Sequence, residues 1–263
     1  MRIYDHDALC RTYFFPEPEA PPPAAGTGAP VRIPHPDGFA LSAWWSRSLP
    51  GAPTVLLFHG NGESVRTDLA FWPRFFARLG VNLLLVDYPG YGASEGRPTF
   101  SSCAEGGRAV LQFLLAQGPD EVPGVVVMGR SMGSWVALKA VEAPASNRVL
   151  GVVLESGIAD LGQRLVDRID YQSAGLDPVE VLAGVRRDFD LKAIVASLGC
   201  PVLVLHARRD SLVPSWHGRL LAEWAGERLG QFALFDDGDH NSILAENFEA
   251  YERVLQDFLS SLT

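Results

Sequence analysis

The feature that most constrains the fold of this chain is the alternation of short, continuously apolar runs with segments of helical periodicity. After Val31, apolar runs lie at 54–58, 82–86, 125–128, 151–154, 201–205 and 231–235. A strand that is apolar at consecutive positions needs cover on both faces, and helices between the strands supply that cover. The pattern predicts an α/β fold with a mostly parallel, doubly wound sheet and helices on both faces.

Turn residues and helical periodicity define the remaining elements. Val31–Pro34 and Ala40–Ser46 flank a Pro-Asp-Gly turn, which is typical of a β-hairpin. Apolar residues recur along one helical face in three stretches, around 72–79, 110–114 and 244–262. The last stretch has the clearest stripe and predicts one continuous C-terminal helix.

Composition limits the classes of partner and compartment. The net charge is −9 and no basic run is present, which argues against nucleic acid as a partner. No apolar run is long enough to span a membrane, and the charged residues near Met1 argue against a signal peptide and stable membrane insertion. The cysteines (Cys10, Cys103 and Cys200) are widely spaced, which favours reduced thiols over a disulfide framework or a metal site. We therefore expect a cytoplasmic protein. The sequence does not indicate its oligomeric state.

The first thirty residues differ in character from the rest of the chain. Pro16–Pro30 is proline-rich and lacks apolar periodicity, so it is expected to form an extended arm or linker. Tyr13, Phe14 and Phe15 precede it, and we expect this aromatic cluster to dock on the domain. The predicted organisation is an arm at 1–30 followed by one domain at 31–263.

A glycine-flanked serine lies between a predicted buried strand and a predicted helix. The segment Gly129-Arg130-Ser131-Met132-Gly133 follows the apolar run at 125–128 and precedes a helical pattern. A serine at such a sharp strand-to-helix turn is exposed in a strained backbone conformation, and its flanking residues must be small to avoid collision. Ser131 is therefore the predicted nucleophile.

A serine hydroxyl needs a base to accept its proton. The candidates are His6, His35, His59, His206, His217 and His240. His240 lies in the loop after the last predicted strand, at the carboxyl edge of the sheet where sites of such folds occur. His206 ends the preceding strand and is the second choice, whereas His6, His35 and His217 are expected to be surface or structural residues. We predict His240 as the base.

The base in turn needs a carboxylate that holds its tautomer and stabilises the imidazolium ion. Asp210 follows the apolar run at 201–205 and therefore lies at the same edge of the sheet. The aspartates close to His240 in sequence are better explained as a solvated turn, because chain neighbours rarely reach the required side-on geometry. Asp210 is the predicted acid.

Acyl transfer also requires two preorganised N–H donors for the oxyanion of the intermediate. The backbone N–H of Met132 directly follows the nucleophile. The second donor is expected to be the backbone N–H of Asn61 in His59-Gly60-Asn61-Gly62, where the flanking glycines permit close approach. His59 is interpreted as a structural brace beneath this loop.

The chain order Ser131, Asp210, His240 with HGNG upstream resembles the α/β-hydrolase family. The segment from Asp87 to Ser94 also resembles the family's D-x-x-G-x-G-x-S motif. The resemblance covers about 31–263 and is greatest to the serine-aminopeptidase/lysophospholipase-like and palmitoyl-thioesterase-like branch. It implies an α/β-hydrolase fold with an eight-stranded sheet whose second strand is antiparallel, and it implies no cofactor. No metal site is expected either. The chain departs from the family pattern at one place: it has His206-Ala207 where the family often has His-Gly before the acid, a change that leaves the triad intact. A serine instead of an aspartate at the strand-to-helix turn argues against a dehalogenase or an epoxide hydrolase.

The segment between Ser156 and Pro201 is longer than a simple crossover needs. Its apolar residues (Leu161, Leu165, Val166, Ile169, Val181, Leu182 and Val185) suggest short amphipathic helices that form a small cap at about 157–190. Its paired charges (Asp160, Arg164, Asp167, Arg168, Asp170, Arg186, Arg187 and Asp188) are typical of a solvated surface. The alternative is that a cap arginine holds a carboxylate or phosphate of the substrate.

These observations predict a cofactor-free serine hydrolase that cleaves small-molecule carboxylic esters or thioesters through an acyl-enzyme. One alternative is a small-peptide aminopeptidase, which would need an acidic group in the cap, such as Glu180, to bind a free amine. The other is a hydrolase fold that serves only for binding; it is disfavoured because the chain keeps a complete set of Ser, Asp and His.

Overall fold

An eight-stranded sheet forms the centre of the molecule. The computed structural model describes residues 2–20, 28–142, 146–166 and 170–262. The strand order is β1-β2-β4-β3-β5-β6-β7-β8, and β2 runs antiparallel to both neighbours while the others are mutually parallel. The strands are β1 (Gly28–Pro34), β2 (Ala40–Ser46), β3 (Thr54–Phe58), β4 (Asn82–Val86), β5 (Val125–Arg130), β6 (Val149–Glu155), β7 (Val202–Ala207) and β8 (Leu229–Phe235). The predicted mostly parallel sheet and its antiparallel second strand are confirmed.

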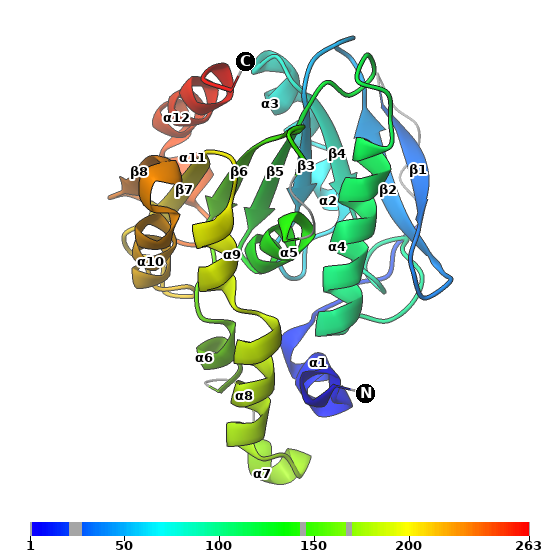
Figure 1. Cartoon of the computed structure of the whole chain (residues 1–263), viewed down its shortest axis with the longest axis vertical. Coiled ribbons are helices and arrows are strands. Elements are labelled where there is room, and N and C mark those ends of the chain that lie inside the picture. Colours follow the sequence, from blue (N-terminus) through cyan, green and yellow to red (C-terminus); the bar gives the residue numbers. More distant parts are fainter. Residues whose placement is uncertain (1, 21–27, 143–145, 167–169, 263) are drawn as a thin grey trace.

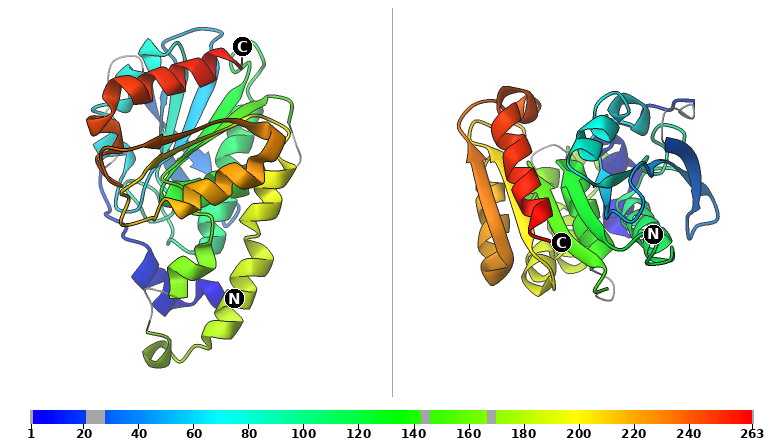
Figure 2. Two further views of the ribbon diagram at one scale, coloured as in Figure 1. Left: turned by 90° about the vertical axis from the view of Figure 1, so that its left-hand side faces the viewer. Right: turned by 90° about the horizontal axis from the view of Figure 1, so that it is seen from above.

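Helices cover both faces of this sheet (Figure 1). One face carries α4 (Phe100–Leu115), α5 (Met132–Val141), α9 (Leu191–Ser197) and α10 (Trp216–Ala225). The opposite face carries α2 (Val65–Asp68), α3 (Trp72–Arg78), α11 (Ile243–Glu246) and α12 (Phe248–Ser260). The view from above in Figure 2 shows α3 and α12 together on one side of the strands.

The central strands are buried on both faces, which explains their continuous apolar runs. Within β3, Leu56 and Phe58 point into the core beneath α4 and α5, while Val55 and Leu57 point into the core beneath α3 and α12. All four side chains are buried. Successive residues of a strand point to opposite faces, so a doubly covered strand tolerates no polar alternation.

The prediction of one continuous C-terminal helix is wrong. The chain forms the short α11 and then α12, with a break at Asn247, whose backbone leaves the helical conformation. The Asn247 side chain donates to the carbonyl oxygens of Asp237 and Ile243, at 2.9 and 2.8 Å. A side-chain amide that competes for backbone partners in this way favours a helix end over a helix interior. The apolar stripe is kept, since Tyr251, Leu255 and Phe258 are buried.

The cap segment and the N-terminal segment lie beyond the carboxyl ends of the parallel strands. In Figure 1, α6 (Leu161–Val166), α7 (Tyr171–Ala174) and α8 (Pro178–Asp188) extend away from the sheet, and α1 (Asp7–Tyr13) lies between α8 and α4. A short 3₁₀ helix, η1 (Ile3–Asp5), precedes α1, and another, η2 (Gly226–Arg228), follows α10. Asp167, Arg168 and Ile169 of the expected cap lie outside the described residues, as does the middle of the expected proline-rich arm.

Candidate active site

The turn between β5 and α5 presents Ser131 at the carboxyl edge of the sheet. Ser131 has φ 52° and ψ −117°, a strained conformation for a residue with a side chain. A Cβ atom on Gly129 would overlap the backbone of Gly133, and one on Gly133 would overlap the carbonyl group of Phe58. Both glycines are therefore needed for the close approach that this turn makes. The Ser131 N–H donates to the Glu155 carbonyl oxygen at 2.8 Å.

Three predicted site residues from distant parts of the chain meet at this turn. His240 Nε2 lies 2.8 Å from Ser131 Oγ, and His240 Nδ1 lies 2.7 Å from Asp210 Oδ2. With a proton on Nδ1, the imidazole donates to Asp210 and its Nε2 accepts from the serine hydroxyl. This arrangement can remove the proton of Ser131 during attack on an electrophile.

The carboxylate of Asp210 is held by several donors. Its Oδ1 accepts from the backbone N–H groups of Leu212 and Val213, at 3.0 and 2.7 Å. Burial alone would raise the pKa of Asp210, but hydrogen bonds from His206 and His240, together with the charge of His240, hold that pKa well below its ordinary value. Asp210 therefore stays ionised wherever the protein is folded near neutral pH.

His206 occupies a different position from His240. It is buried at the end of β7, and its Nε2 lies 2.8 Å from the carbonyl oxygen of Val213 and 3.4 Å from Asp210 Oδ2. It thus supports the loop that carries Asp210 and does not contact Ser131. His217 is also buried, where its Nδ1 accepts from the Ala159 N–H at 3.1 Å.

The loop after β3 places Asn61 beside the same site. Among the described residues, no protein acceptor takes the backbone N–H of Asn61 or that of Met132. The Gly60 N–H, in contrast, donates to Glu63 Oε2 at 2.6 Å. His59 is buried beneath the loop, with its Nδ1 2.7 Å from the Gly60 carbonyl oxygen.

Arg130 links the loops of the site and was not singled out by the sequence. Its guanidinium pairs with Glu63 of the Asn61 loop and with Glu155 at the end of β6, the latter at 3.2 Å. It also donates to the carbonyl oxygen of His240 at 3.1 Å. The sequence could have indicated this cluster by position, because Arg130 and Glu155 are the last residues of parallel strands and Glu63 lies in the loop after another, all at the same edge of the sheet.

Asp68 lies near this charged cluster at the end of α2. Burial and the negative charge of Glu63 raise the pKa of Asp68 to about 8, against the opposing charge of Arg130. Its Oδ2 is buried and has no hydrogen-bond partner among the described residues. The folded protein therefore keeps a proton on Asp68 that the unfolded chain releases above about pH 4.

We expect Asp68→Asn to stabilise the protein in a pH-dependent way. Since the folded-state pKa is raised, the wild type loses stability as the pH rises from about 4 to about 8 and then levels off. An amide does not titrate, so the gain in free energy of unfolding should grow over this window to on the order of 1–3 kcal/mol at pH 8. Urea unfolding at pH 5 and pH 8 measures it, with the exposed Asp120→Asn as control. The same gain at both pH values would contradict the assignment.

A cavity of about 320 Å³ opens over Ser131 and His240. Its charged lining includes Arg130 and Glu63, which pair with one another. Arg164 of α6 brings a cap arginine to the same cavity. The apolar lining is formed by Tyr13, Phe15, Met132, Ile158, Leu212 and Val213. The site is thus a small concavity whose lining combines these apolar side chains with polar and charged ones, including Asn61 and Asn241.

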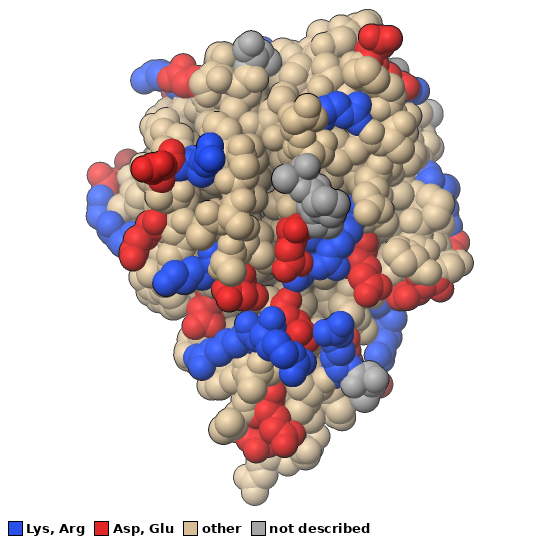
Figure 3. All heavy atoms as spheres, viewed as in Figure 1, with Lys and Arg blue, Asp and Glu red and all other residues tan. Residues whose placement is uncertain are grey.

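Two charged residues at the end of α8, Arg187 and Asp188, form an ion pair with each other. Asp188 at the end of α8 contacts Arg2 at 2.5 Å and Arg187 at 3.0 Å. On the face shown in Figure 3, positive and negative side chains alternate around this region. These described charges fit the expected solvated surface.

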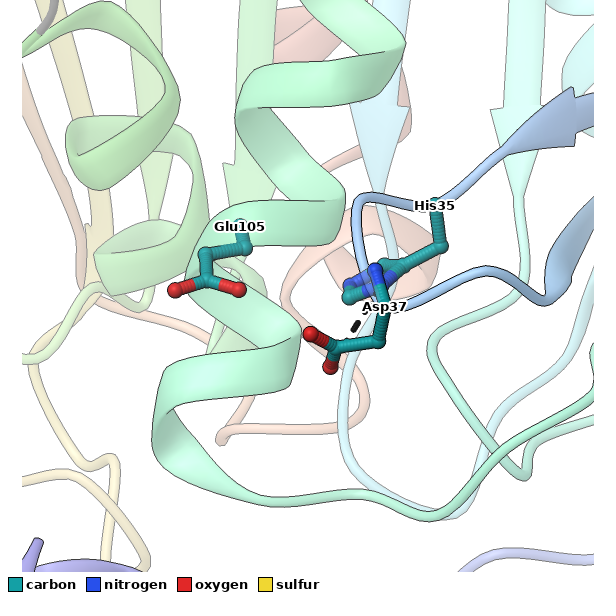
Figure 4. Close-up of side chains that lie close together, drawn as sticks. All are labelled: His35, Asp37 and Glu105. Carbon is teal, nitrogen blue, oxygen red and sulfur yellow. Dashed lines mark hydrogen bonds and ion pairs between the residues drawn. The ribbon is translucent and has the colours of Figure 1, made fainter. Parts of the chain in front are cut away.

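His35, Asp37 and Glu105 are close enough to be considered as metal ligands (Figure 4). Both ring nitrogens of His35 are already engaged: Nε2 lies 2.9 Å from the Ser102 carbonyl oxygen, and Nδ1 accepts from the Asp37 N–H at 3.1 Å. A metal requires a free nitrogen lone pair. The group therefore does not fit a metal centre, and His35 is a structural residue between the β1–β2 turn and α4.

Comparison with known proteins decides the family. A model of the alpha/beta hydrolase family matches residues 55–193, which include the Asn61 loop and the Ser131 turn. This chain belongs to the α/β-hydrolase family. The match agrees with the resemblance seen in the sequence motifs.

Relatives of this α/β-hydrolase cover most of its length. The alpha/beta hydrolase domain-containing protein WAV2 of Arabidopsis thaliana is 28% identical over 234 residues, which are 85% of this chain and 75% of the relative. The bem46 protein of Schizosaccharomyces pombe is 25% identical over 217 residues, covering 82% and 70%.

Solved structures share the fold of this α/β-hydrolase. An esterase from Pyrococcus furiosus superposes with a TM-score of 0.68 and 20% identity, covering 92% of this chain and 97% of its own. The esterase Est1E of Butyrivibrio proteoclasticus, bound to ferulic acid, gives a TM-score of 0.71 with 17% identity and coverages of 88% and 98%. Within the part of the α/β-hydrolase that the structure describes, no helix has the length and apolarity to cross a membrane.

Proposed function

We propose that this protein is a serine hydrolase that cleaves small carboxylic esters or thioesters through an acyl-enzyme. The observation that carries the proposal is the continuous hydrogen-bonded chain Ser131–His240–Asp210 at the base of a cavity, with distances of 2.8 and 2.7 Å. Nucleophile, base and orienting acid in this order are the requirements for covalent catalysis by a weakly acidic hydroxyl.

In the first half-reaction, Ser131 Oγ forms a bond to the carbonyl carbon while its proton passes to His240 Nε2. Asp210, held ionised, stabilises the imidazolium ion without taking its proton. The carbonyl oxygen becomes an oxyanion, and the free N–H groups of Asn61 and Met132 are the donors we assign to it. His240 then protonates the leaving alcohol or thiol as its bond to carbon breaks.

In the second half-reaction, water takes the place of the alcohol. His240 accepts a proton from the water as its oxygen attacks the acyl carbon, and returns that proton to Ser131 Oγ as the acid product leaves. Since every step uses side chains and N–H groups of this chain, the mechanism that we propose includes no cofactor or metal.

The cavity favours esters over peptides with a free amine. An aminopeptidase would need an acidic side chain available to an ammonium group, yet Glu63, the acidic residue among the described cavity-lining ones, pairs with Arg130. Glu180 is exposed in the first turn of α8 and does not line the cavity. A protein that only binds its ligand does not require a serine hydroxyl hydrogen-bonded to a histidine, as Ser131 is to His240.

The test is a substrate comparison with purified protein. We expect turnover of p-nitrophenyl esters and of acyl thioesters, and little or none of aminoacyl-anilides. Turnover of the anilides alone would favour the peptidase, whereas no turnover of any substrate would favour the binding protein. Esters of dicarboxylic acids in the same panel test whether Arg164 recognises an acidic group.

We expect Arg130→Lys to lower kcat roughly tenfold to a hundredfold with a smaller change in KM. Lysine keeps the charge but cannot bridge Glu63, Glu155 and the His240 carbonyl at once, so the reacting groups lose their alignment. Arg148→Lys is the matched control, since Arg148 also donates to backbone carbonyl groups but lies away from the site. A lower melting temperature with unchanged kcat would show that Arg130 serves stability alone.

A further inference from the structure

The cavity over Ser131 is bounded by two large apolar side chains that remain accessible. Phe15 is 51% exposed and Leu212 is 42% exposed, and both line this cavity. Phe71, Val179 and Trp216 are also exposed, but do not line it. Accessible apolar surface inside a reactive concavity is stabilised when a hydrocarbon group covers it.

The segment that carries Phe15 is firmly attached to the body. Leu9, Tyr13 and Phe14 are buried in the main core, with Tyr13 and Phe14 packed on Phe100 of α4. Tyr4 donates to Asp188 of α8 at 2.9 Å. Figures 1 and 2 show this N-terminal segment beside both α4 and the cap helix α8.

The backbone at Phe15 is held by the loop of the proposed oxyanion site. The Phe15 N–H donates to Asn61 Oδ1 at 3.0 Å and to the Tyr91 hydroxyl at 2.9 Å. Asn61 Nδ2 donates in return to the Tyr13 carbonyl oxygen at 2.5 Å. The main chain of Phe15 is therefore fixed, while its ring is left accessible at the cavity.

We propose that the N-terminal segment forms a wall of the substrate cavity and that Phe15 and Leu212 make an apolar subsite for the hydrocarbon group of the substrate. The proposal rests on the proposed ester hydrolysis and names the substrate class: esters with a short aliphatic or aromatic group on the acyl or alcohol side. The cavity volume of about 320 Å³ is near the lower end of the range for ligand-binding cavities. The hydrocarbon group of the substrate is therefore expected to be short.

Two ester series test the subsite. One varies the acyl chain from acetate to hexanoate with p-nitrophenol constant, and the other varies the alcohol from methanol to hexanol with acetate constant. In at least one series, the wild type should have a higher kcat/KM for the longer ester than for the shorter one. Phe15→Ser and Leu212→Ser should each reduce this ratio about tenfold, mainly by raising KM for the longer ester. Phe15→Leu should keep most of it. Phe71→Ser, an exposed phenylalanine away from the cavity, should leave it unchanged.

A binding measurement separates this proposal from the proposed function. Hexanoate and hexanol, the products of the longest esters, are titrated into each protein by calorimetry. At least one of them should bind the wild type about tenfold more tightly than it binds Phe15→Ser, whether or not esters are cleaved. That difference without any ester turnover would overturn the hydrolase and keep the subsite. Unchanged preference in both series together with equal product binding would overturn the subsite.

Discussion

Ser131→Ala should abolish ester turnover, with kcat falling by up to roughly 10⁶-fold. The change removes the oxygen that lies 2.8 Å from His240 Nε2, so no acyl-enzyme forms and only the background from binding and the oxyanion donors remains. The melting temperature should stay close to that of the wild type, because the strained turn is held by Gly129 and Gly133. Initial rates with a p-nitrophenyl ester measure the loss.

Ser197→Ala is the matched control, since Ser197 lies on the surface at the end of α9. It should keep wild-type turnover. Near-normal activity in Ser131→Ala, with normal folding, would rule out Ser131 as the nucleophile.

His240→Ala should reduce kcat by roughly three orders of magnitude or more. His206→Ala should cost far less, because His206 contacts Asp210 and the Val213 carbonyl group but not Ser131. Steady-state kinetics of both variants on one ester provide the comparison. If His206→Ala proved the more damaging of the two, with both variants folded, the role of base would have to pass to His206.

Much of the fold follows from local patterns in the sequence. The runs at 54–58 and 82–86 coincide with β3 and β4, because strands buried on both faces show uninterrupted apolar residues. The positions of Ser131, Asp210 and His240 at one edge follow from the same reasoning, since each lies in the connection that follows a parallel strand. The Pro-Asp-Gly turn predicted the hairpin of β1 and β2, and the family resemblance added that the second strand is antiparallel within the sheet.

The remainder depends on contacts between distant segments. No local pattern indicates that Tyr13 of α1 packs on α4, that Tyr4 of η1 contacts α8, or that Phe15 reaches the Asn61 loop. The Gly-x-Ser-x-Gly motif does not specify the residue at Arg130, so only the assembled sheet edge shows its contacts with Glu63 and Glu155. The break at Asn247 likewise depends on the Asp237 carbonyl oxygen, which a helical periodicity does not reveal.

The most direct test of the central claim is covalent labelling with a fluorophosphonate, followed by mass-spectrometric mapping of the modified peptide. The proposed mechanism predicts rapid labelling of the wild type at Ser131, slow labelling of His240→Ala and none of Ser131→Ala. Labelling that persists in Ser131→Ala, or that maps to another residue in the wild type, would contradict it.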